Sequence, residues 1–196
     1  MLINNSRAMK LLMCILIGFV TTTHAQYVYE PSNDFPYGRP NPDAPRALRD
    51  YQDLIGSCDC FSTRRNPDGT WSDKEPMSWR FKYIMNGTAI QDETLKEGGI
   101  HSGSIRQFNT DSSKWYVHYY SNRSASKTLS TWEGGQKADS LVLYRNQKAP
   151  NGSDGFYRIV FSNISNQGFN WVGAWVDPTE TIVFPTWKIK CRKRLE

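Results

Sequence analysis

The chain has little of what most enzymes and nucleic-acid-binding proteins display. Among its 196 residues there are only three histidines and four cysteines, and 24 Lys and Arg residues nearly balance 19 Asp and Glu residues. There is no Gly-x-Ser-x-Gly elbow, no phosphate-binding loop, no His-Glu-x-x-His pair and no dinucleotide fingerprint. We therefore predict neither a cofactor nor a bound metal.

Long hydrophobic runs are also missing, with one exception near the N-terminus. Residues 11–20 are apolar but too few to span a bilayer, Arg7 and Lys10 precede them, and Ala25 is a small residue before a cleavage point at Gln26. Residues 1–25 are predicted to be a secretory signal peptide. The mature chain is then exported to the periplasm or the outside of the cell, with no membrane span of its own.

The charge of the mature chain limits the kinds of partner. Cleavage leaves 22 basic and 19 acidic residues, a net charge of +3, and the only basic stripe is residues 188–194. A nucleic-acid partner is not predicted. The mild excess suits a small-molecule ligand or acidic oligosaccharide, and equally suits a surface whose charges only confer solubility.

Three cysteines remain after cleavage, and an oxidising compartment favours a disulfide between two of them. Cys58 and Cys60 are two residues apart and share one face of a predicted strand. If the sheet closes, the first and last strands become neighbours. We therefore predict a bridge from Cys191 to either Cys58 or Cys60.

The chain beyond residue 42 reads as one β-rich domain, residues 43–196, behind an extended or loosely ordered arm, residues 26–42. A short helix is predicted over residues 43–53, with Asp43 as its N-cap. About ten strands follow, with turns at Asn86-Gly87 and Gly134-Gly135. The predicted strands cover residues 55–64, 77–85, 88–95, 103–109, 115–120, 127–133, 140–146, 156–164, 169–176 and 181–191.

Several of these motifs resemble those of a known fold family. Gly56, Asn86-Gly87, Gln91-Asp92, Ile105-Arg106 and Lys114-Trp115 are similar to the calycin-type, lipocalin-like domain of bacterial secreted proteins of unknown function. The resemblance covers residues 44–193 and implies an all-β antiparallel lipocalin-like barrel with an internal cavity, but no particular ligand.

One position departs from that family pattern. A Trp is expected two residues after Gly56 and is replaced by Cys58. In such barrels this Trp packs across the closed end, a role that a Cys58–Cys191 bridge could take over. The haem-binding calycins keep the Gly-x-Trp-x-Gly start that Cys58 and Cys60 replace here, so haem is not predicted.

Polar and aromatic side chains within the strands are the candidates for a site. Arginine binds carboxylates through a two-pronged fork, and Trp faces stack on sugar rings. His118 and Tyr120 are the catalytic candidates, as groups that can exchange a proton. The ligand-binding candidates are Gln91, Asp92, Arg106, Arg158, Trp115, Trp171 and Trp175.

These residues lead to three functional hypotheses. The first is a carrier that binds a small or oligosaccharide ligand, anionic in character, in the barrel. The second is a metal-independent lyase or dehydratase on uronic-acid sugars, in which Arg106 or Arg158 neutralises the carboxylate and His118 or Tyr120 moves the proton. The third is a structural envelope protein, in which Arg106 and Asp92 simply pair across neighbouring strands. A polar pocket holding Arg106, His118 and a Tyr favours the enzyme, an apolar cavity favours a hydrophobic ligand, and a filled interior favours the structural role.

Overall fold

The computed structural model describes residues 27–194, so the predicted signal peptide lies outside the described part of the chain. Ten strands follow one 3₁₀ helix, η1 (Arg46–Leu54). They are β1 (Gly56–Arg64), β2 (Glu75–Ile84), β3 (Ala89–Lys96), β4 (His101–Asn109), β5 (Lys114–Ser121), β6 (Ser130–Lys137), β7 (Ser140–Asn146), β8 (Phe156–Ser165), β9 (Gly168–Val176) and β10 (Val183–Lys193). The all-β fold and the number of strands are as the sequence predicted.

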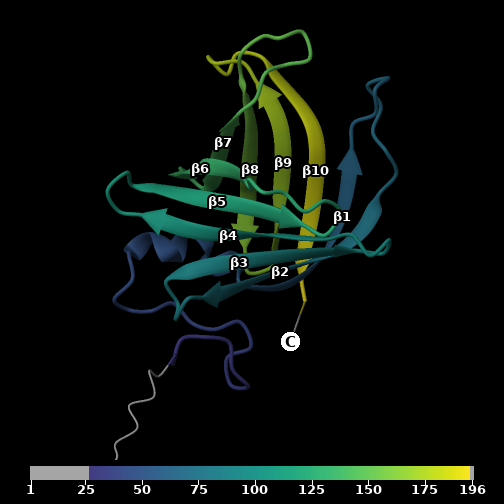
Figure 1. Ribbon diagram of the computed structural model, residues 1–196. Coiled ribbons are helices and arrows are strands. Elements are labelled where there is room, and N and C mark those ends of the chain that lie inside the picture. Colours follow the sequence, from purple (N-terminus) through teal and green to yellow (C-terminus); the bar gives the residue numbers. More distant parts are fainter. Residues whose placement is uncertain (1–26, 195–196) are drawn as a thin grey trace, which may run out of the picture.

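The strands form a closed antiparallel barrel in which each strand pairs with its neighbours in sequence and β10 pairs with β1. In Figure 1, β2 to β5 cross in front of β7 to β10 at a steep angle, so the wall curves around an interior. Closure leaves no unpaired edge strand. Among the described residues, no helix is long and apolar enough to cross a bilayer.

Strict alternation fills the interior with large side chains. In β2, Met77, Trp79, Phe81 and Tyr83 are all buried, while Arg80 between them is exposed. Side chains that alternate between buried and exposed are expected in a strand with one face towards the interior and the other towards solvent. Trp79 and Phe81 meet Phe161 and Phe169 from the opposite wall as an aromatic cluster, with ring centroids 5.3–6.3 Å apart.

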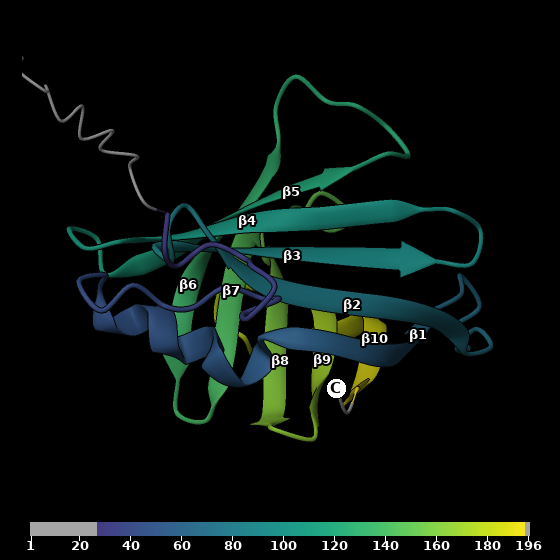
Figure 2. The ribbon, with the colours of Figure 1, turned by 90° about the horizontal axis from the view of Figure 1, so that it is seen from below.

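The helix η1 closes one end of the barrel (Figure 2). Leu48, Tyr51 and Leu54 point inward and are buried, and the Tyr51 ring packs edge-on against Trp115 at 4.8 Å. The predicted cap is wrong: the helix begins after Pro45, and no side chain caps it. Pro45 is the N-cap residue, with φ −51° and ψ 138° outside the helical region, and its ring allows this conformation.

The turn predicted at Gly134-Gly135 is wrong, whereas the turn predicted at Asn86-Gly87 is present but longer than the two-residue hairpin turn that this dipeptide suits. Gly134 and Gly135 lie inside β6, where a side chain on Gly134 would collide with the carbonyl oxygen of Val142 in β7. Glycine permits this close approach of two backbones. The β2–β3 connection is a four-residue loop rather than a two-residue turn, with positive φ at Met85, Asn86 and Gly87.

That loop is held by the N-terminal arm, which is packed against it. The backbone N–H of Tyr29 donates to Oδ1 of Asn86 at 3.2 Å, the N–H of Asn86 donates to Glu30 at 2.6 Å, and the N–H of Asn41 donates to the carbonyl of Gly87 at 3.0 Å. These long-range bonds offset the cost of left-handed backbone at non-glycine positions. Neither the arm nor its bonds could be seen in the local pattern of the hairpin.

Candidate ligand-binding cavity

The barrel encloses a cavity of about 460 Å³ that opens at the end opposite η1. Strands from the whole wall line it with mainly apolar and aromatic groups. Its walls include Met77, Trp79, Val117, Trp132, Leu143, Ile159, Phe161, Trp171, Trp187 and Ile189. Binding sites for small molecules in proteins are typically about 300–1,000 Å³ and of this apolar character.

At its inner end the cavity meets a buried ion pair. Arg106 in β4 donates from Nε (2.9 Å) and one terminal nitrogen (2.6 Å) to Oδ2 of Asp92 in β3, and both residues are 3 % exposed. Trp79 donates to the other carboxylate oxygen at 3.0 Å, and the Ser104 hydroxyl also donates to Asp92. Burial opposes the charge on Arg106, but the Asp92 carboxylate raises its pKa, so the guanidinium stays ionised.

Aromatic rings enclose the remaining sides of that guanidinium. Its carbon lies 5.1–5.5 Å from the ring centroids of Tyr51, Phe81 and Phe161. The third nitrogen donates to the Tyr51 hydroxyl at 3.3 Å, and burial raises the pKa of that tyrosine. All three guanidinium nitrogens of Arg106 therefore have partners, which makes this network a structural anchor for η1 and the closed end.

The open end carries a different set of charges. Arg64, Arg123 and Arg145 line the mouth, and none of the three pairs with a carboxylate among the described residues. Glu75, the acidic residue that lines the mouth, pairs with Lys96. The mouth is therefore net positive.

Two of these arginines are held by aromatic rings of the cavity wall. The guanidinium carbon of Arg64 lies 3.7 Å above the Trp187 ring, and that of Arg145 lies 4.4 Å above the Trp132 ring. Tyr157 lies within the electrostatic reach of both arginines, and its hydroxyl is 3.1 Å from that of Thr186. Burial nevertheless raises the pKa of Tyr157, so it remains a neutral phenol.

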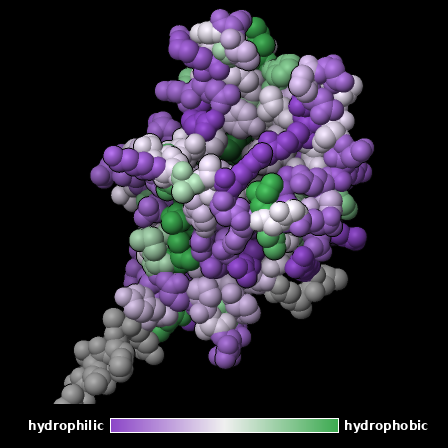
Figure 3. Space-filling model, turned by 45° about the vertical axis from the view of Figure 1, so that its right-hand side comes forward, coloured by the Kyte–Doolittle hydropathy of each residue, from purple (hydrophilic) through white to green (hydrophobic). Residues whose placement is uncertain are grey.

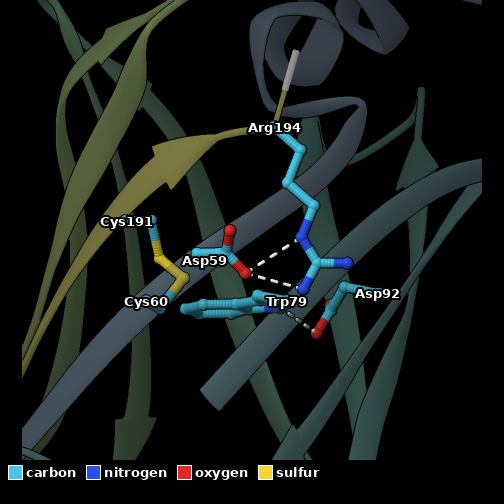
Figure 4. The surroundings of a disulfide bond; sticks show 6 residues. All are labelled: Asp59, Cys60, Trp79, Asp92, Cys191 and Arg194. Atoms are coloured by element: carbon cyan, nitrogen blue, oxygen red, sulfur yellow. Dashed lines mark hydrogen bonds and ion pairs between the residues drawn. A yellow bond between two sulfur atoms is a disulfide. The ribbon is translucent and has the colours of Figure 1, made fainter. Parts of the chain in front are cut away.

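The seam between β1 and β10 carries the disulfide. Cys60 and Cys191 are direct partners in the register and are bonded, whereas Cys58 is a buried free thiol. One of the two predicted pairings is thus confirmed. Figure 4 shows the bond beside Trp79, with Arg194 bonded to Asp59 at 2.6 Å nearby. Burial raises the pKa of the Cys58 thiol, which keeps it protonated at neutral pH.

The structure brings only part of the predicted site together. Arg106, Asp92 and Trp171 line the cavity. Trp115 is fully buried near η1, where it donates to Asp50 at 3.0 Å, and Trp175 donates to the backbone of Gln147 at 2.9 Å. Neither of these two tryptophans is part of the cavity wall.

The remaining candidates belong to the outer face of the wall. His118 bonds Thr131 across β5 and β6 at 3.0 Å, and the Gln91 amide donates to the Tyr120 hydroxyl at 2.7 Å. Arg158 pairs with Glu180. Their inward-facing neighbours Val117, Asp92 and Ile159 line the cavity instead. The group of Arg106, His118 and Tyr120 in one pocket is therefore not assembled.

The sequence reasoning missed Arg64, Arg145 and Tyr157. A signal for the first two existed: Arg145 continues the alternation of Leu141 and Leu143, and Arg64 continues that of Cys58 and Cys60. An arginine at the last inward position of a strand lies where the core meets solvent. Within residues 27–194, no three His, Cys, Asp or Glu side chains are grouped to hold a metal.

Comparison with known proteins gives similarity of shape alone. No protein-family model matches the chain. No curated protein matches it. The crystal structure of Rv2717c from M. tuberculosis is similar with a TM-score of 0.48 and 10 % identity, covering 78 % of this chain and 100 % of that one. The structure of EF1p2_mFAP2b bound to DFHBI has a TM-score of 0.34 and 13 % identity, covering 76 % and 99 %. The closed ten-strand antiparallel barrel fits a calycin-like fold by its own strand order.

Proposed function

We propose that this protein binds one small, mainly apolar molecule inside its barrel, as an exported carrier. The observation that supports this most is the cavity of about 460 Å³ whose wall is built from buried aromatic and aliphatic side chains. A structural envelope protein has no need of such a space, because interiors otherwise pack to the density of organic crystals. The disulfide fits an oxidising compartment and the predicted export.

The outer surface supports the same proposal. The face shown in Figure 3 is mainly hydrophilic, with its hydrophobic residues in small separate patches. Large exposed apolar patches mark binding surfaces for proteins or membranes. On this face no extended apolar patch competes with the cavity, and the cavity fits a small ligand rather than a macromolecule.

The lyase hypothesis receives no such support. The residues predicted for it are not brought together, because His118 and Tyr120 lie on the outer face and Arg106 is fully bonded to Asp92 and Tyr51. An oligosaccharide ligand is the weaker form of the carrier proposal, because sugars need many hydrogen-bond partners and the greater part of the exposed cavity surface is apolar.

The test is titration of the oxidised chain with N-phenyl-1-naphthylamine, a neutral dye that fluoresces in apolar pockets. We expect saturable binding with one equivalent and quenching of tryptophan emission, since Trp79, Trp132, Trp171 and Trp187 line the cavity. A digalacturonate disaccharide, tested by calorimetry, should bind at least about tenfold more weakly, a difference of about 1.4 kcal/mol.

Two matched variants locate the site. Val117→Trp fills space inside the barrel, whereas His118→Trp, one residue along the same strand, adds the same ring to the outer face. Dye binding should be lost in the first and kept in the second. If Val117→Trp does not fold, Ile159→Phe adds less volume to the same cavity and should weaken binding. Equal binding by both members of the pair would overturn the proposal, and so would preference for the disaccharide.

A further inference from the structure

The three cavity-lining arginines of the mouth, unlike the cavity-lining Arg106, have no acidic partner in the described chain, and this difference points to the chemistry of the ligand. Resting on the proposed function, we propose that the ligand is an amphipathic anion whose single carboxylate, sulfonate or phosphate group binds at the mouth between Arg64, Arg145 and Tyr157, with its apolar body in the barrel.

The geometry of Arg145 supports the anion site. Its guanidinium is half-buried, stacks on Trp132 at 4.4 Å and donates to the side-chain oxygen of Gln147 at 2.6 Å. Burial without an opposite charge lowers the pKa of Arg145. A half-buried cation of this kind is costly in the empty protein, and an anionic group that pairs with it offsets the cost.

Arg64 provides the second cation. It is exposed at the end of β1, but its stacking on Trp187 at 3.7 Å restricts its rotamers and holds it at the rim. A pre-ordered guanidinium loses less conformational entropy when it binds an anion. Tyr157 lies within electrostatic reach of both cations and, as a neutral phenol, can donate a hydrogen bond to the same anionic group.

The inner end of the cavity is unsuitable for the anion. The carboxylate of Asp92 already compensates Arg106 there, and a second anion beside it would be repelled in a site of low dielectric. The charge distribution therefore fixes the orientation of the ligand, with the head at the mouth and the body inward. An apolar cavity without these charges would accept such a ligand in either direction.

A pair of dyes that differ by one anionic group tests the inference. N-phenyl-1-naphthylamine and 8-anilino-1-naphthalenesulfonate share the same rings, and only the second carries a sulfonate. We expect wild-type protein to bind the sulfonate at least about tenfold more tightly, because hydrogen bonds between an ionised donor and an ionised acceptor are stronger than those between neutral groups. The preference should shrink as NaCl is raised.

Variants assign the preference to residues. Arg64→Met and Arg145→Met keep the stem of the side chain and remove its charge. Each should weaken binding of the sulfonate about tenfold and change binding of the neutral dye less than twofold. Arg192→Met removes one charge from an exposed position of β10 outside the cavity, and should alter neither affinity.

The outcomes separate the two proposals. If the neutral dye binds but the sulfonate has no advantage, or if Arg192→Met weakens it as much as Arg145→Met does, the anion site is refuted and the carrier proposal remains. If neither dye binds, the carrier proposal itself fails. If Arg145→Met keeps its fold, as judged by circular dichroism, and yet binds neither dye, that result would refute the proposal that Arg145 acts only on the anionic group of the ligand.

Discussion

Arginine side chains pack on aromatic rings at both ends of the barrel, but their other partners differ. At the closed end, Arg106 lies among Tyr51, Phe81 and Phe161 and is bonded to Asp92. At the open end, Arg64 and Arg145 stack on Trp187 and Trp132 with no carboxylate partner in the described chain. The comparison teaches that the partner, rather than the arginine, determines whether such a group is structural or available to a ligand.

The largest expected effect comes from breaking the closed end. Asp92→Asn removes the charge that compensates Arg106 while keeping the shape of the side chain. Removing one partner of a buried pair costs about 3–5 kcal/mol, because the other charge stays buried alone. The free energy of unfolding in urea should fall by that amount.

The matched control for this loss is Glu180→Gln, which removes the acidic partner of Arg158 on the outer face. This pair is partly exposed, with side-chain exposures of 22 % and 36 %, and ion pairs near the surface contribute about 1 kcal/mol or less. If Asp92→Asn costs no more than Glu180→Gln, then the closed end is not held by a buried ion pair, and the contrast between the two ends disappears.

The next largest effect is expected at the seam between β1 and β10. The Cys60–Cys191 bond links residues 131 apart in sequence and joins the first strand to the last. Cross-links of this kind typically contribute about 2–4 kcal/mol, mainly by restricting the unfolded chain. Reduction should lower the unfolding free energy by that amount.

Cys58→Ala provides the control for the seam. It removes the buried thiol and keeps the bond, so reduction should cost this variant as much as it costs the wild type. A Cys58→Ala protein that is insensitive to reductant would mean that Cys58, rather than Cys60, forms the bond with Cys191. Dye binding in the cavity should survive reduction wherever the protein remains folded.

A smaller effect concerns pH and the closed end. Burial raises the pKa of Tyr83 to about 12, above its ordinary value of 10.0. The neutral phenol is favoured in the folded state, so its contribution is complete below pH 10 and is lost as the pH rises towards 12. The resulting loss of unfolding free energy between pH 9 and pH 11.5 should amount to about 2 kcal/mol.

Subtraction isolates this contribution. Urea unfolding of wild type and Tyr83→Phe at the two pH values cancels the titration of the other groups. The wild type should lose about 2 kcal/mol more than the variant over this range. Parallel losses would place the Tyr83 hydroxyl in contact with solvent.

The fold was largely predictable from the sequence because it depends on local patterns. Alternation in segments such as residues 77–85 marks strands directly, and closure follows once ten strands share one buried face. The errors lie where distant segments decide the geometry. The arm fixes the conformation at Asn86, and the neighbouring strand β7 explains Gly134.

The site was less predictable for a related reason. Parity tells which residues share a face of a strand, but not which face is the interior when both faces carry aromatics, as with Trp115 and Tyr116 of β5. Val117 is inside, so His118 is outside. Whether an inward arginine meets an acid is a property of two strands. The predicted pairing of Arg106 with Asp92 across β3 and β4 is present, whereas the inward position of Arg145 in β7 was not considered.

The smallest expected effect is that of Arg145→Met on stability. It tests the contrast between the two ends most directly, because the same Arg→Met substitution can be made at the closed end in Arg106. Arg145→Met should change the free energy of unfolding by less than about 1 kcal/mol and in the stabilising direction, since it replaces an uncompensated, half-buried cation with an apolar chain of similar length. Arg106→Met should cost about 3–5 kcal/mol, because it leaves the Asp92 carboxylate buried. A large loss in Arg145→Met would show that the fold itself depends on the mouth arginine, and the two ends would then differ in degree rather than in kind.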